Sequence, residues 1–159
     1  MTFTALKVGF IGLGTMGTPM ALNLRKAGHS LFVASRSKIP TAFAEEGATV
    51  CTNAAEVAKR ADIIITMVPD TPHVEDALFN PEGVAAGLSK GKIVVDMSSI
   101  SPVATKDFAK RINALGCEYL DAPVSGGEVG AKAGADPAKV RQALMGGFAN
   151  SRILEVHGE

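Results

Sequence analysis

The stretch from Val8 to Gly17, which reads VGFIGLGTMG, constrains the fold more than any other part of the chain. An apolar run ends in a turn with the G-x-G-x-x-G spacing, and an amphipathic segment follows directly. Between a strand and a helix, such glycines permit a tight turn, a close approach of a pyrophosphate and close helix–strand packing. The N–H groups that begin the helix also favour phosphate. The alternative is an ordinary glycine-rich turn. The residues expected to bind a dinucleotide are Ile11, Gly12, Leu13, Gly14, Thr15, Met16 and Gly17.

The rest of the chain alternates short apolar runs with amphipathic segments. The predicted strands are residues 7–11, 31–34, 49–51, 62–68, 92–96 and 117–120. The predicted helices are residues 15–27, 40–46, a segment capped by Asn53 with Glu56, 71–79, and a segment from Pro102 to about 115 with Ser101 as its cap. The first helix is expected to face the sheet with Met16, Met20, Leu24 and Ala27. This alternation predicts an α/β fold, a Rossmann-type doubly wound parallel sheet.

Ligands of such a sheet bind beyond the carboxyl ends of its strands. Four predicted strand ends, one of them the glycine turn, therefore converge on one crevice. The further candidates for cofactor binding are Ser35, Arg36, Met67, Val68, Pro69, Ser98 and Ser99.

Arg36 bears on which dinucleotide is preferred. NAD-dependent domains usually carry Asp or Glu about 20 residues after the glycines, to hold the ribose hydroxyls. Here the second strand is followed by Ser35, Arg36 and Ser37, with no acid. A planar guanidinium suits a 2′-phosphate, although an arginine in a loop can also be merely solvated. We therefore expect NADP, with NAD possible.

Composition excludes several other classes of function. Sixteen basic residues balance sixteen acidic ones, so no net charge attracts nucleic acid or an anionic membrane. Cys51 and Cys117 lack metal-site spacing and are interpreted as reduced thiols, with a disulfide left open. The apolar segment from Val8 to Leu24 holds four glycines, Pro19 and Asn23, and Arg25 follows it, so it is not interpreted as a signal or a membrane span. We expect a cytoplasmic protein without a metal site.

Four segments together resemble the β-hydroxyacid dehydrogenase family. They are FIGLGTMGTPM at 10–20, MVPD at 67–70, DMSSISP at 96–102 and DAPVSGG at 121–127, and the resemblance covers residues 7 to about 134. The nearest branch is that of the tartronate semialdehyde (2-hydroxy-3-oxopropionate) reductases of glyoxylate metabolism. The 3-hydroxyisobutyrate dehydrogenases come next, and imine reductases are a weaker match.

The resemblance implies hydride transfer between NADP(H) and a small 3-hydroxy or 3-oxo acid. It also implies that Ser125, Gly126 and Gly127 hold the substrate carboxylate, and that Ser98 and Ser99 lie near the nicotinamide. Backbone N–H groups beside a hydroxyl can form such an anion site. The alternative for 125–127 is a glycine turn after an edge strand. Asp121, just before a proline, is interpreted as a loop cap.

The family's catalytic lysine lies in a Gly-x-x-x-Lys-x-x-x-Asn pattern that this sequence lacks. Neither Lys132 nor Lys139 matches it, so no catalytic residue is assigned. Residues 135–159 resemble a later helical part of the family. We therefore expect residues 1–134 to form the NAD(P)-binding domain and 135–159 to be a short helical remnant, joined near Lys132 by an internal shortening. Such a chain would be weakly active or inactive, and its tail could drive self-association.

Overall fold

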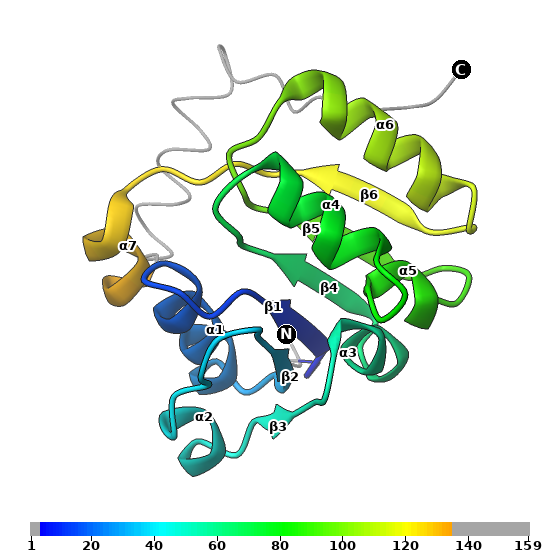
Figure 1. Ribbon diagram of the computed structural model, residues 1–159. Coiled ribbons are helices and arrows are strands. Elements are labelled where there is room, and N and C mark those ends of the chain that lie inside the picture. Colours follow the sequence, from blue (N-terminus) through cyan, green and yellow to red (C-terminus); the bar gives the residue numbers. More distant parts are fainter. Residues whose placement is uncertain (1–3, 135–159) are drawn as a thin grey trace.

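The computed structural model describes residues 4–134. Its centre is a six-stranded parallel sheet with the order β3-β2-β1-β4-β5-β6 (Figure 1). The strands are β1 (Lys7–Ile11), β2 (Ser30–Ala34), β3 (Thr49–Val50), β4 (Ile63–Thr66), β5 (Ile93–Asp96) and β6 (Glu118–Asp121). The chain starts in the middle, builds one half outward and returns to build the other. This is the predicted Rossmann-type fold, and it places the switch in strand order between β1 and β4.

Helices cover both faces of the sheet. They are α1 (Gly17–Lys26), α2 (Ala42–Glu45), α3 (Ala54–Arg60), α4 (Thr71–Phe79), α5 (Val84–Gly87), α6 (Pro102–Asn113) and α7 (Gly127–Ala133). Neighbouring strand residues point to opposite faces, so Ile64 packs into the core with α3 to α6, and Ile65 into the core with α1 and α2. Burial on both faces explains why the central strands β1 and β4 are almost entirely apolar.

The helix boundaries differ from the sequence predictions in instructive ways. Helix α1 buries Gly17 and Ala21 and ends at Lys26, so Ala27 is exposed and its predicted contact with the sheet is wrong. Within the described residues, Ser101 makes no side-chain capping bond at α6, although Pro102 does begin the helix. The short helices α5 and α7 were not predicted.

The predicted capping box of α3 is half formed. The Asn53 side chain accepts a hydrogen bond from the Glu56 N–H at 2.9 Å. The Glu56 carboxylate, however, accepts from the N–H of Thr52 at 2.7 Å instead of returning to the capping residue itself. The hydrogen bonds from the N–H and the hydroxyl of Thr52 lower the pKa of Glu56.

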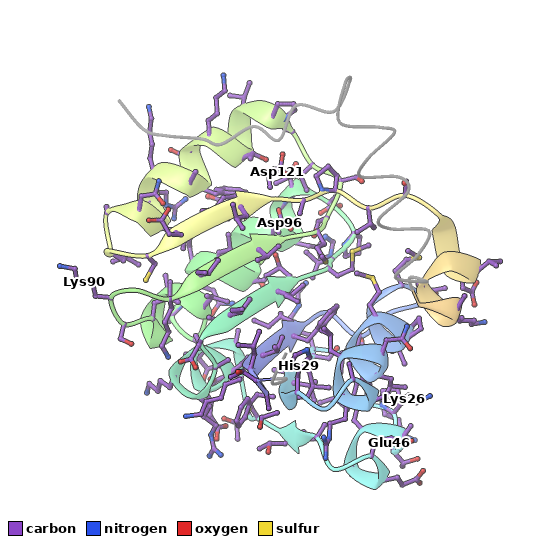
Figure 2. The ribbon with its side chains drawn as sticks, turned by 180° about the vertical axis from the view of Figure 1, so that it is seen from behind. Lys26, His29, Glu46, Lys90, Asp96 and Asp121 are labelled. Carbon is purple, nitrogen blue, oxygen red and sulfur yellow. The ribbon has the colours of Figure 1, made fainter. Side chains whose placement is uncertain are left out.

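Asp96 ties three strands together at the carboxyl edge of the sheet. It is fully buried and accepts hydrogen bonds from the Thr66 hydroxyl at 2.9 Å, the Ser98 N–H at 3.0 Å and the Tyr119 hydroxyl at 3.1 Å. Burial, together with the negative charge of Asp96, raises the pKa of Tyr119, so that hydroxyl keeps its proton and donates. Asp121 lies at the end of β6, in register with Asp96 (Figure 2), and its pKa is also raised, by burial and then by that charge.

The described residues test some of the remaining expectations from the sequence but not others. Both cysteines are buried and free in the described region, so the open disulfide does not form there. The edge strand β6 exposes Leu120 by 42%. The predicted helical tail at 135–159 lies outside the described residues. Among residues 4–134, every helix is too short or too polar to cross a bilayer.

Candidate functional site

The strand ends form one cavity of about 690 Å³ at the carboxyl edge of the sheet. This volume is within the range of small-molecule and cofactor sites, about 300–1,000 Å³. The predicted cofactor residues that line it are Ile11, Gly12, Leu13, Gly14, Thr15, Met16, Gly17, Ser35, Arg36, Met67, Val68, Pro69 and Ser99. The structure thus brings together residues that follow four strands, β1, β2, β4 and β5, as the doubly wound topology requires.

A different structural reason favours glycine at each of the three positions of the turn. Gly12 has φ +96°, and a Cβ there would lie 2.1 Å from the Met67 carbonyl oxygen. A Cβ on Gly17 would lie 1.9 Å from the Gly12 carbonyl oxygen, so this position permits the close approach of α1 to the turn. A Cβ on Gly14 would meet no described atom within 4 Å. Because Gly14 lines the cavity, its missing side chain leaves space for a ligand instead of for packing.

The start of α1 suits an anion at the same place. Among the described residues its N-cap, Met16, makes no side-chain capping bond, and its first turn carries no acidic residue. The N–H groups that open a helix lack partners within it and favour negative charge. The Thr18 hydroxyl donates to the Leu13 carbonyl at 2.8 Å and fixes the turn between them. The glycine turn, the open space and the helix start therefore fit a pyrophosphate.

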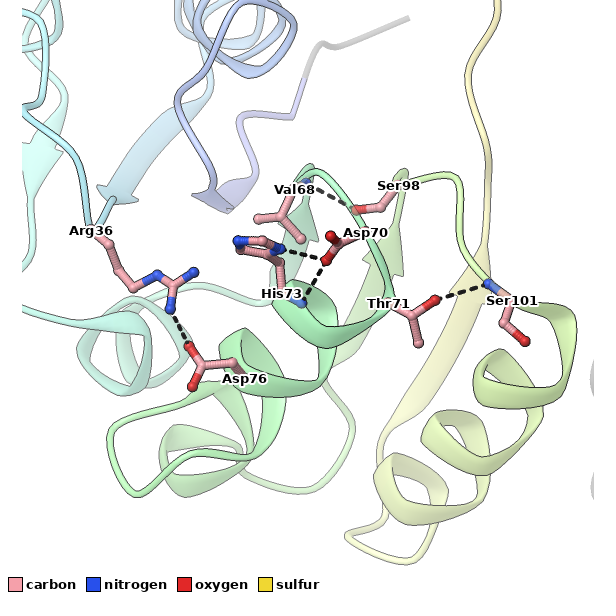
Figure 3. A network of polar contacts seen from close by, with 8 residues as sticks. All are labelled: Arg36, Val68, Asp70, Thr71, His73, Asp76, Ser98 and Ser101. Atoms are coloured by element: carbon pink, nitrogen blue, oxygen red, sulfur yellow. Dashed lines mark hydrogen bonds and ion pairs between the residues drawn. The ribbon is translucent and has the colours of Figure 1, made fainter.

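Arg36 follows β2 and also lines the cavity. Its guanidinium donates to the Asp76 carboxylate of α4 at 2.8 Å (Figure 3). The Arg36 side chain is 69% exposed, so it can reach a ligand in the cavity.

Ser98 does not line the cavity. It is 1% exposed, and its hydroxyl accepts a hydrogen bond from the Val68 N–H at 3.0 Å (Figure 3). Ser98 therefore connects Asp96 to the backbone of the β4 end. Ser98 supports the cavity wall through Val68 without being part of it, and its exposed neighbour Ser99 lines the cavity.

Ser125, Gly126 and Gly127 also lie away from the cavity. Ser125 and Gly126 end the exposed link after β6, and Gly127 begins α7, which packs beside α1 in Figure 1. Gly126 and Gly127 have φ values of +109° and +57°, a succession that favours glycine at both positions. The link is held near α1 because the Asn23 amide donates to the Ala131 carbonyl at 2.8 Å. Lys132, expected to be solvated, is exposed and pairs with Glu128 at 2.5 Å.

The sequence prediction missed a second group of cavity residues, most of them polar. They are Ala34, Ser37, Thr52, Asn53, Ala54, His73, Asp76, Ala77, Asn80 and Glu82. His73, Asp76 and Ala77 lie on α4 at helical spacing, Asn80 is its C-cap, and α4 follows the predicted strand end at 67–69. The 3.6-residue period could therefore have indicated this helix face.

Asp70, the N-cap of α4, gives a testable pH dependence. The hydrogen bonds from the His73 ring and from its N–H hold the pKa of this carboxyl below its ordinary value (Figure 3). The ionised form thus stabilises the fold above the ordinary pKa, and this contribution is lost as the pH falls through the lowered pKa. Between about pH 5 and pH 2, Asp70→Asn, which keeps a capping oxygen, should flatten the decline in urea stability. Asp107→Asn, an exposed change on α6, serves as control. Parallel curves for wild type and Asp70→Asn would contradict the assignment.

Comparisons with known proteins agree with this geometry. A family model described as the NAD binding domain of 6-phosphogluconate dehydrogenase matches residues 7–137. The 2-hydroxy-3-oxopropionate reductase of Escherichia coli is 42% identical over 97% of this chain and 75% of its own. The chain belongs to the β-hydroxyacid dehydrogenase family. It therefore carries the family's NAD(P)-binding domain, as predicted.

Other known proteins are similar over shorter stretches of this chain. The mitochondrial 3-hydroxyisobutyrate dehydrogenase of Drosophila melanogaster is 46% identical over 80% of this chain and 39% of its own. A solved 3-hydroxyisobutyrate dehydrogenase of Mycobacterium tuberculosis, with L-serine, is 33% identical with a TM-score of 0.73, over 88% of this chain and 50% of its own. A structure titled Psf3 in complex with NADP+ and 2-OPP has a TM-score of 0.75 at 28% identity, over 87% and 52%.

The lengths of these matches bear on the predicted shortening. The chain spans half or less of the Drosophila and mycobacterial dehydrogenases. The match to the Escherichia coli reductase covers 219 residues, more than the 159 of this chain. That family member therefore carries residues within the matched region that have no counterpart here.

Proposed function

We propose that this chain is the NADP-binding part of a reductase of the 2-hydroxy-3-oxopropionate (tartronate semialdehyde) type. The observation that carries the proposal is the cavity in which the glycine turn, Arg36 and the 67–69 segment meet. In it the pyrophosphate would lie against Gly12 to Gly17, and a 2′-phosphate would lie against Arg36. A bound nicotinamide would supply the hydride; the chain's own residues bind and orient the cofactor.

Substrate binding would fall to the link after β6. We propose that Ser125, Gly126 and Gly127 hold the carboxylate of a small 3-hydroxy or 3-oxo acid, with Ser99 nearer the nicotinamide. This assignment rests on the family resemblance, and the positive φ values of Gly126 and Gly127 mark a turn that favours glycine at both positions. A 3-hydroxyisobutyrate-type substrate is the second candidate, because relatives of that activity match the chain as well.

We further propose that residues 1–134 are the cofactor domain and 135–159 a remnant of a helical domain, joined by an internal shortening. The excess length of the match to the Escherichia coli reductase supports this arrangement. No residue of this chain fits the family's lysine pattern, and loss of a general acid typically costs about 10²- to 10⁴-fold in rate. We expect cofactor binding with weak or absent turnover.

A paired measurement tests both levels of the proposal. NADPH binding is measured by the fluorescence of NADPH. NADPH oxidation is measured with two substrates in separate assays, tartronate semialdehyde and the aldehyde that oxidation of 3-hydroxyisobutyrate produces. Binding with oxidation at least about 100-fold slower than a full-length relative is the expected result. Oxidation at the relative's rate would show that another group replaces the lysine. Failure to bind either NADPH or NADH would refute the proposed function.

The choice between the cofactors is tested at Arg36. Arg36→Gln should weaken NADP binding by about tenfold or more, because a charge-assisted contact to phosphate is lost, and should change NAD binding little. Arg60→Gln is the matched control, since Arg60 is also exposed and ion-paired but lies outside the cavity wall. Titration of both cofactors by calorimetry gives the two affinities. Equal losses for NADP and NAD would remove Arg36 from a 2′-phosphate site.

A further inference from the structure

The cavity contains a counter-charge directly beside the expected 2′-phosphate site. Asp76 lies on α4, and its carboxylate accepts a hydrogen bond from Arg36 at 2.8 Å, 40 residues away in the sequence (Figure 3). Both residues line the cavity. A second carboxylate, Glu82, and the ring of His73 also line it, and Glu82 lies 3.5 Å from the Asn53 amide.

The pair contributes little to folding. The side chains of Arg36 and Asp76 are 69% and 42% exposed. Exposed ion pairs are close to neutral for stability, because solvent screens the attraction and ordering two side chains costs entropy. The contact instead affects how strongly Arg36 can bind an anionic ligand, because its guanidinium already pairs with the Asp76 carboxylate.

We propose that Asp76 sets the cofactor preference by competing with a 2′-phosphate for Arg36. This inference rests on the proposed function. When the phosphate of NADP pairs with Arg36, Asp76 loses its partner and remains close to a group of about two negative charges. When NAD binds, Arg36 keeps Asp76, and that carboxylate can accept from the ribose hydroxyls as an acid does in NAD-dependent domains. Asp76 thus moderates the preference that Arg36 creates and lets the chain accept both cofactors.

Charge removal at Asp76 should therefore favour NADP. Two like charges a few ångströms apart near a surface repel enough to change affinity by about three- to tenfold, and salt screens the effect. Asp76→Asn keeps the shape and the hydrogen-bonding oxygen. It should tighten NADP by that factor at low salt, leave NAD unchanged or slightly weaker, and lose most of the difference at about 1 M salt.

The experiment is a calorimetric titration of NADP and NAD into wild type, Asp76→Asn and Glu75→Gln. Glu75 is the preceding residue of α4, exposed and 3.2 Å from Arg111, and it lies outside the cavity wall. Its change removes the same charge from the same helix and should alter neither affinity. Asp76→Ala provides a second variant, with the same expected direction.

The outcomes separate the two proposals. A rise in the NADP-to-NAD affinity ratio in both Asp76 variants, absent in Glu75→Gln, supports the inference. An unchanged affinity ratio, or an equal rise in Glu75→Gln, overturns the inference. If the wild type still binds the cofactors in that case, the proposed function is unaffected. A wild type that binds neither cofactor overturns the proposed function and this inference with it.

Discussion

Gly17→Ala should destabilise the domain by about 1–3 kcal/mol or more, because it places a methyl group against backbone. The added Cβ would lie 1.9 Å from the Gly12 carbonyl oxygen and 3.2 Å from Cε1 of Phe10. Neither contact can be relieved by rotating a flexible side chain. The gain in helix propensity from glycine to alanine is at most about 1 kcal/mol, so the clash dominates. Urea unfolding followed by circular dichroism measures the loss.

Gly14 provides the matched control on the same turn. Gly14→Ala meets open space, so stability should stay within about 0.5 kcal/mol of wild type. Gly14→Val should also fold, yet it fills the cavity at the expected pyrophosphate position. It should weaken NADPH fluorescence binding by about tenfold or more, equivalent to about 1.4 kcal/mol. Equal stability losses at Gly14 and Gly17 would contradict the division of roles between the two glycines.

The fold could be predicted from sequence because its local signals agree with one another. β1 is an apolar strand buried on both faces, the glycine turn follows it, and α1 begins within the turn, as the G-x-G-x-x-G spacing indicates. The predicted helix at 71–79 coincides with α4, where the N-cap Asp70 and a proline in the first turn both mark its start. Agreement between capping, periodicity and turn chemistry is what makes such a segment predictable.

Two features of the site were not predicted from the sequence. One is a tertiary contact, and the other follows from an alternation of buried residues that continues beyond the end of a strand. The Arg36–Asp76 pair joins two elements 40 residues apart, and no local pattern encodes it. Ser98 was expected in the crevice because it follows a strand end. Period-two alternation instead continues past β5, so Ser98 falls on the same buried side as Asp96.

Asp96→Ala should produce a large loss of stability, about 3 kcal/mol or more. The change leaves three donors without their acceptor: the Thr66 hydroxyl, the Tyr119 hydroxyl and the Ser98 N–H. Each buried donor left unsatisfied costs about 1–3 kcal/mol. Asp107→Ala, an exposed carboxylate on α6, should change stability by less than about 1 kcal/mol. The free energy of unfolding in urea compares the two variants.

A milder pair of changes distinguishes a network from independent contacts. Tyr119→Phe removes one hydrogen bond and should cost about 1 kcal/mol. In an Asp96→Asn background its cost should shrink, because the Tyr119 hydroxyl has already lost its charged acceptor. Strictly additive losses would show that Tyr119 and Asp96 act separately.

Because Ser98 joins Asp96 to the Val68 N–H at the cavity wall, a folded Asp96→Asn variant should also bind NADPH more weakly than wild type. The same buried carboxylate would then stabilise the sheet edge and hold the cofactor pocket in shape.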